Sequence, residues 1–124
     1  MIKKNLKLEF GLISVHENVL IAELNEGILF SVENNRKLLE LGRDIFDGKA
    51  YGYISNRTHS YAVDPMVYKE SSNVDTLKAI AVVSKNHLVK LNARQVEQKF
   101  YKNPEAFEVF DTLEEALNWM KSKF

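Results

Sequence analysis

The chain has no cysteine, and it has only two prolines and five glycines among its 124 residues. Without cysteine it cannot form a disulfide, a thiolate nucleophile or a zinc site with thiolate ligands, and a reducing cytoplasm is its simplest location. The few glycines form neither the Gly-x-Gly-x-x-Gly pattern of dinucleotide-binding proteins nor a lysine-containing phosphate loop. These absences exclude cysteine chemistry and the common nucleotide-binding motifs, and we expect no cofactor.

Excess charge of one sign and long apolar runs are missing as well. Lys plus Arg and Asp plus Glu both total 17, so the net charge is zero, whereas a general nucleic-acid binder needs surplus positive charge. No segment approaches the roughly 20 apolar residues of a membrane span, and no apolar run follows the basic N-terminus as in a signal peptide. We therefore expect a soluble, cytoplasmic protein without a nucleic-acid partner. Zero net charge gives little colloidal repulsion, which favours a homodimer.

What the chain does contain is the composition of a single globular domain over residues 1–124. Hydrophobic residues make up 45% of the chain and charged residues 27%, which are ordinary values. Short β-type patterns at residues 7–10, 11–16 and 19–24 are separated by turn residues. They predict a small antiparallel meander at the start of the chain.

Strands and helices alternate in the rest of the chain. Helices are predicted over 31–46, 64–71, 86–100 and 112–120, and strands over 50–55, 77–83 and 106–110. The run 77–83 is apolar throughout, which is typical of a strand buried on both faces. We predict an α/β fold with a mixed β-sheet, an antiparallel N-terminal edge and about four α-helices packed against the sheet.

Helix boundaries have clear sequence signals. The Ser31 hydroxyl can cap one helix, Asp64 and Pro65 begin the next, and Thr112 with Glu115 predicts a capping box for the last. In the helix at 86–100, apolar residues recur at spacings that would line one face. These residues are Leu88, Leu91, Val96 and Phe100.

A run of hydrogen-bonding side chains follows the strand predicted at 50–55. Because strand ends meet helix N-termini at one edge of an α/β sheet, a binding site is expected there. Arg57 offers a planar fork for a carboxylate or phosphate group. The alternative interpretation is a surface loop whose polar side chains satisfy its own backbone. The candidate ligand- or partner-binding residues are Asn56, Arg57, Thr58, His59, Ser60, Tyr61, Asp64 and Tyr68.

Other site chemistries have weaker signals. The histidines His16, His59 and His87 show no His-x-His or His-x-x-x-His spacing, so no metal site is predicted. Ser60, His59 and Asp64 could be drawn as a triad, but adjacent Ser and His side chains rarely face each other. No Gly-x-Ser-x-Gly motif is present either. We therefore predict no catalytic residues and no enzyme activity.

The closing segment Phe107-Glu-Val-Phe-Asp-Thr-Leu-Glu-Glu-Ala-Leu-Asn-Trp119, with the order of elements and the chain length, resembles the SpoIIAA-like proteins. These belong to the STAS superfamily, which includes bacterial anti-sigma factor antagonists. The resemblance implies a non-enzymatic module that binds a protein partner or a small ligand. Antagonists of this family carry a phosphorylatable Ser in an Asp-Ser-Ser-Gly-like context. Residues 56–65 lack that motif, and Ser60 matches no position in it, so kinase-controlled sigma-factor regulation is not implied.

Three functional hypotheses follow. The leading one is a regulatory or interaction module that recognises a protein partner or an anionic group at residues 56–61 and the helix after them. Arg57 would be its anchor, so Arg57→Ala should fold normally and lose the partner. The second hypothesis is a binder of a small, amphipathic or lipid-like molecule, in a pocket lined by Tyr51, Tyr53, Tyr61 and Tyr68. The third is an enzyme, which would need His59 within about 3 Å of a carboxylate, and Asp64 is the nearest in sequence.

Overall fold

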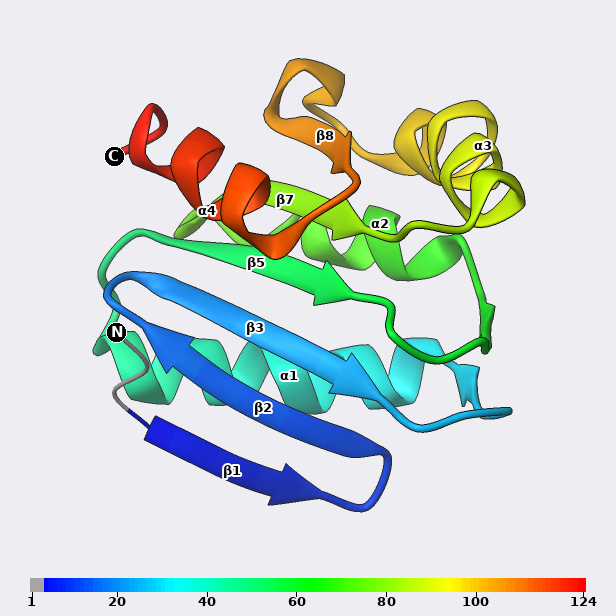
Figure 1. Cartoon of the computed structure of the whole chain (residues 1–124). Helices are drawn as coiled ribbons and strands as arrows, with labels where there is room; N and C mark the ends of the chain where they lie inside the picture. Colours follow the sequence, from blue (N-terminus) through cyan, green and yellow to red (C-terminus); the bar gives the residue numbers. More distant parts are fainter. Residues whose placement is uncertain (1–3) are drawn as a thin grey trace.

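A six-stranded mixed sheet forms the centre of the protein, whose computed structural model describes residues 4–124 (Figure 1). The strands lie in the order β1-β2-β3-β5-β7-β8. The first three pair antiparallel, and the pairs from β3 to β8 are parallel. The predicted α/β fold with an antiparallel N-terminal edge is therefore confirmed. The strands are β1 (Lys4–Leu8), β2 (Gly11–His16), β3 (Val19–Leu24), β5 (Tyr51–Asn56), β7 (Leu77–Val83) and β8 (Phe107–Phe110).

Four α-helices pack against this sheet within residues 4–124. They are α1 (Val32–Phe46), α2 (Met66–Ser71), α3 (His87–Gln95) and α4 (Leu113–Lys121). Two 3-10 helices, η1 (Glu97–Phe100) and η2 (Pro104–Ala106), lie between α3 and β8. The predicted caps are confirmed at two helices, because Ser31 accepts a hydrogen bond from the Asn34 amide at 3.1 Å and Thr112 forms a capping box with Glu115.

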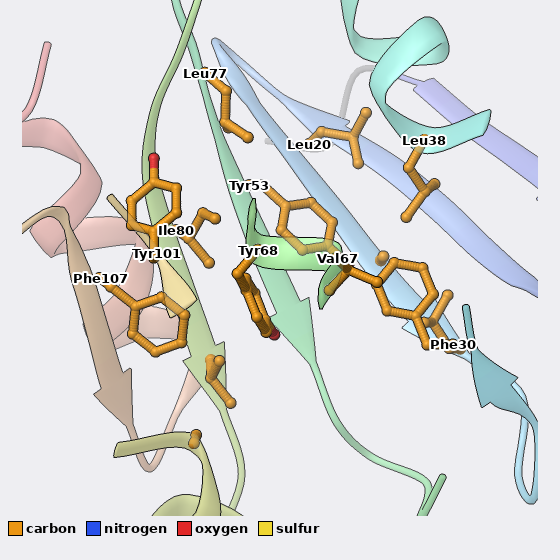
Figure 2. Packing of buried hydrophobic residues seen from close by; sticks show 14 of the residues in the cluster. Leu20, Phe30, Leu38, Tyr53, Val67, Tyr68, Leu77, Ile80, Tyr101 and Phe107 are labelled. Atoms are coloured by element: carbon orange, nitrogen blue, oxygen red, sulfur yellow. The ribbon is translucent and has the colours of Figure 1, made fainter. Parts of the chain in front are cut away.

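Apolar side chains fill both faces of the sheet. The larger layer lies on the face covered by α1 and α2 and contains several aromatic rings, among them Tyr68 and Phe107 (Figure 2). The smaller layer joins β3, β5 and β7 to α4 through Ala116 and Met120. Strand β7 supplies side chains alternately to the two layers, as Ile80 and Ala81 illustrate. It is therefore buried on both faces, as its apolar sequence predicted.

The β-structure differs from the prediction at two places. The first strand is Lys4–Leu8 and not 7–10, because Glu9 and Phe10 form the turn into β2. A separate two-stranded parallel sheet joins β4 (Leu29–Phe30) to β6 (Ala62–Val63). A strand of two residues is too short to show a period of two, so the sequence pattern did not reveal it.

The predicted helix at 86–100 is wrong over its last five residues. The α-helix ends at Gln95, and Val96, with φ −117° and ψ −62°, separates it from η1. The break places Glu97 inside the protein, where it is 1% exposed. Of the expected apolar face, Phe100 packs against the core, but Leu88 is 72% exposed, and Ala93 is the buried residue of α3. Leu91 and Val96 are exposed as well.

Candidate binding site at the carboxyl edge of the sheet

Strands β5, β7 and β8 end side by side at one edge of the sheet. Asn56 pairs in register with Val83, and Val83 pairs with Phe110. Residues 56–61, here called loop 56–61, leave this edge from β5, while α3 follows β7 and α4 follows β8 (Figure 1). The loop and the N-termini of two helices are therefore brought together, although they are far apart in the sequence.

A cleft of about 560 Å³ opens at this edge, and we call it the edge cleft. Its wall includes five of the eight predicted site residues, those at 56–60. The remaining wall comes from the segments that follow β7 and β8. The full lining is Asn56, Arg57, Thr58, His59, Ser60, Val83, Ser84, Lys85, Asn86, Val89, Asp111, Thr112 and Leu113.

A second hollow, of about 390 Å³, lies between loop 56–61 and α3, and we call it the side groove. It shares Arg57, His59, Ser60 and Val89 with the edge cleft, so the two hollows adjoin. Apolar and polar side chains mix along it. The rest of its lining is Tyr61, Ala62, Val63, Leu88, Asn92 and Glu97.

The electrostatics of the edge cleft favour a negative group. The N-termini of α3 and α4 reach its wall at Asn86 and Thr112, and helix N-termini carry partial positive charge. Glu114 and Glu115 in the first turn of α4 offset that charge, whereas the first turn of α3 has no acidic residue. Lys85 is exposed on the same wall. Asp111 is the acid of the wall, and a hydrogen bond from the Lys90 ammonium lowers the pKa of its carboxyl. That acid is thus already matched by a cation. The first amides of both helices are also bonded to capping side chains, those of Leu88 and Val89 to Asn86 and that of Glu115 to Thr112. Lys85 is therefore the exposed cation that this wall offers to a ligand.

Arg57 lies inside the protein, where it forms a closed network. Its side chain is 7% exposed, and it makes two hydrogen bonds to the Glu97 carboxylate, of 2.8 and 2.5 Å. Its Nε donates to Ser55 Oγ at 3.0 Å, and Nη2 donates to the Tyr68 hydroxyl at 3.0 Å. Tyr68 in turn donates to Glu97 at 2.5 Å. The guanidinium is therefore engaged by the protein itself, which does not fit the expected role of a free anion anchor.

The Glu97 carboxylate is held ionised by this network. Burial acts to raise the pKa of Glu97, but the hydrogen bonds and the charge of Arg57 outweigh burial, so the pKa is lowered. The Asn92 side chain adds a further bond at 3.2 Å. Removing one partner of a buried ion pair typically costs about 3–5 kcal/mol, because the other charge is left unpaired. The network thus ties the start of loop 56–61 to η1.

The tyrosines expected to line a ligand pocket form part of the filled core. Tyr51, Tyr53 and Tyr68 are 2%, 8% and 2% exposed. Burial raises the pKa of Tyr51 to about 12. The void beside Tyr51 and Tyr53 measures only about 10 Å³, room for about one water molecule. The Tyr68 ring meets the Phe107 ring edge-on at 5.4 Å (Figure 2). These three rings therefore fill the core, whereas Tyr61, the fourth of the expected tyrosines, lines the side groove.

The exposed part of the loop is Thr58, His59 and Ser60. Thr58 donates a hydrogen bond to the Glu23 carboxylate at 3.2 Å, and the Ser60 amide donates to Glu26 at 3.0 Å. His59 Nδ1 lies 4.0 Å from Glu26 Oε1. The carboxylate beside His59 is thus Glu26 and not Asp64, and it lies beyond the distance of about 3 Å needed for proton transfer.

Asp64 and α2 belong to the scaffold. Asp64 Oδ1 accepts a hydrogen bond from the Met66 amide at 3.0 Å, but the N-cap of α2 is Pro65 and the helix begins at Met66, one residue later than predicted. The helix then packs against α1, where Asn35 donates to the Val67 carbonyl and to the Ser71 hydroxyl, both at 3.1 Å. The wall beside loop 56–61 is consequently α3 and not the predicted helix after the loop.

Five polar residues of the edge cleft were missed by the sequence analysis. Ser84, Lys85 and Asn86 follow β7, and Asp111 and Thr112 follow β8. A signal for them was available, because the ends of neighbouring parallel strands share one edge of a sheet. The predicted parallel order would have grouped these segments with loop 56–61.

No group of three or more His, Asp or Glu side chains in residues 4–124 is placed to hold a metal ion. Within the same residues, the helices are too short or too polar to cross a membrane. Family models, curated proteins and solved structures give no match to this chain. Its function must therefore be inferred from the geometry of the site.

Proposed function

We propose that this protein is a non-enzymatic, STAS-like interaction module that recognises an anionic group of a protein partner at the edge cleft. One observation carries the proposal: loop 56–61 and the N-termini of α3 and α4 meet around a single cleft. The dipole at a helix N-terminus favours an anion even where side chains cap its amides, as Asn86 and Thr112 do here, and Lys85 adds a full positive charge. A cytoplasmic location and a homodimer belong to the same proposal.

Recognition in this proposal is carried by exposed groups, and Arg57 has a positioning role. Thr58, His59 and Ser60 present hydroxyl and imidazole groups on the cleft wall. Arg57, fixed by Glu97, holds the loop against η1. The loop is thereby presented in one conformation, which reduces the ordering cost of binding.

A free small anion is the other source of the same chemistry. The cleft volume of about 560 Å³ falls within the roughly 300–1,000 Å³ range of small-molecule sites. Native mass spectrometry of gently purified protein distinguishes the two sources. A bound small mass supports the free anion, whereas a clean spectrum leaves the protein partner.

A charge-reversal experiment tests the proposal. Wild-type protein, Lys85→Glu and the control Lys37→Glu are immobilised, and the proteins that they capture from a lysate of the source cells are compared. Both lysines are exposed, but Lys37 lies on α1, away from the cleft. We expect a partner captured by the wild type and Lys37→Glu to be reduced at least tenfold with Lys85→Glu. Equal capture by all three proteins would contradict the proposal.

A further inference from the structure

The two outer strands of the six-stranded sheet differ in how their free edges are covered. At β8 the Phe107 carbonyl accepts a hydrogen bond from Gln98 Nε2 at 2.9 Å. The Val109 amide on the same edge donates to Glu108 Oε1 at 3.0 Å. At the opposite edge, no strand of residues 4–124 lies beyond β1 (Figure 1). Side chains thus close the β8 edge, whereas the β1 edge is open.

The turn between β1 and β2 shows which backbone groups of β1 are open. Leu8 pairs with Gly11 across a turn of two residues, and the residues that flank such a turn form a hydrogen-bonded pair. Along an antiparallel ladder, hydrogen-bonded pairs alternate with pairs that are not hydrogen-bonded. Leu6 and Leu8 are therefore bonded to β2, whereas the N–H and C=O groups of Asn5 and Lys7 point away from it. Both of these residues are exposed.

The larger core layer also ends at this edge. Leu6 and Leu8 pack against that layer, but both are only half-buried. A strand added beside β1 would cover more of these two side chains while it paired with the open backbone groups. The edge of β1 therefore offers both main-chain hydrogen bonds and apolar contact.

The occupant that this edge fits is a second copy of β1. In antiparallel pairing about a two-fold axis at Leu6, Asn5 of each copy lies opposite Lys7 of the other copy. Each of these two pairs exchanges both N–H and both C=O groups, which makes four hydrogen bonds and uses every open group of Asn5 and Lys7. The two Leu6 side chains meet between these pairs, on the face that continues the core layer. The strand is therefore complementary to itself.

Charge selects this register. A lysine on an edge strand opposes pairing where it meets a like charge. An axis at Lys7 would set the two Lys7 side chains opposite each other, whereas the axis at Leu6 sets each of them against the neutral Asn5. An axis at Asn5 would leave the open groups of Lys7 without a partner among residues 4–124. The zero net charge of the chain adds no long-range repulsion between copies.

We infer that two copies of this chain join through β1, antiparallel about Leu6, so that their sheets form one continuous sheet. The inference rests on the homodimer named in the proposed function, and it assigns the interface. The edge cleft lies where β5, β7 and β8 end, whereas β1 is the outermost strand at the other side of the sheet. Both copies therefore keep their clefts open to a partner.

Cysteine cross-linking tests the interface and its register, because the chain has no cysteine of its own. In the inferred register the two Leu6 Cα atoms lie about 4.5 Å apart, within the range of about 4.4–6.8 Å found in disulfides. Leu8 is the matched control, because its two copies would lie about 13 Å apart. We expect Leu6→Cys to give a covalent dimer on mild oxidation and Leu8→Cys to remain monomeric on a denaturing gel. No dimer with Leu6→Cys, or equal dimer with both variants, would overturn the inference.

A proline variant adds a test that leaves Leu6 unchanged. Lys7→Pro removes an N–H that points away from β2, where an edge strand tolerates proline, so circular dichroism should show a folded protein. Lys7→Thr is the control, because it removes the same charge and keeps the N–H. By analytical ultracentrifugation we expect wild type and Lys7→Thr to dimerise, and Lys7→Pro to have a dissociation constant about tenfold higher or more. A monomeric wild type, or equal dissociation constants for the two variants, would contradict pairing through β1.

The result at β1 is distinguishable from the result at the edge cleft. Lys7 does not line the cleft, so Lys7→Pro should still capture the partner that Lys85→Glu loses. A monomeric wild type with that capture pattern would overturn the interface and leave recognition at the cleft standing. Equal capture by all variants, with a dimer that only Lys7→Pro weakens, would leave the interface and remove the cleft.

Discussion

Arg57 and its neighbours at 58–60 stand next to one another in the sequence but in opposite environments. The Arg57 side chain is 7% exposed and bonded to Glu97, whereas Thr58, His59 and Ser60 are exposed. Charged pairs contribute little at the surface, with a median near 0–1 kcal/mol, but breaking a buried pair costs several times more. One polar run can thus contain both a buried structural residue and exposed residues that are free of the core.

The same contrast explains the break in the helix that follows β7. In a continuous helix over 86–100, helical spacing alone would set the direction of the Glu97 side chain. The turn at Val96 instead brings the carboxylate to the guanidinium of Arg57. Because a buried, unpaired arginine is costly, this pairing outweighs the few hydrogen bonds of a regular helix.

The largest effect on stability is expected from breaking the buried Arg57–Glu97 pair. Arg57→Ala leaves the Glu97 carboxylate buried without its partner, so the free energy of unfolding should fall by about 3–5 kcal/mol. Urea denaturation measures this loss. Arg36→Ala is the control, because it removes an arginine whose pair with Glu70 is at the surface, with a side chain 64% exposed. A loss below about 1 kcal/mol for Arg57→Ala would contradict a structural role.

A smaller effect on stability is expected from lowering the pH. The pKa of Glu97 is lowered below its ordinary 4.5 in the folded protein, so the unfolded chain binds the proton more readily. The stability that Glu97 contributes is therefore fully present above about pH 4.5 and is lost as the pH falls toward the folded pKa. Glu97→Gln should accordingly lose less stability than the wild type between neutral and acidic pH. Parallel acid losses in the two proteins would contradict an ionised Glu97.

The smallest effect on stability is expected from changing an exposed residue of loop 56–61. Thr58→Ala removes one surface hydrogen bond, to Glu23, and should change the free energy of unfolding by less than about 0.5 kcal/mol. If loop 56–61 recognises a partner, the same variant should weaken capture of that partner. A folded variant with unchanged capture would place recognition elsewhere than Thr58.

Much of the fold was predictable because its signals are local. Ser31 and Thr112 cap their helices, and the apolar run at 77–83 predicted a strand buried on both faces. The edge cleft also had a local signal, since loop 56–61, which lines it at residues 56–60, follows a strand directly. The burial of Arg57 had no local signal, because its partner Glu97 lies 40 residues further along the chain. Strands β4 and β6 escaped prediction because they have only two residues each.

The division of roles between the buried Arg57 and the exposed residues 58–60 is tested most directly by the double variant Arg57→Met, Glu97→Met. Replacing a buried ion pair with apolar side chains of similar volume is often tolerated, so the fold should be retained. Urea denaturation and partner capture are then measured on the same protein. Our account predicts a folded double variant that still captures the partner lost by Lys85→Glu. A folded double variant without capture, beside Lys85→Glu with full capture, would show that Arg57 itself is the recognition residue.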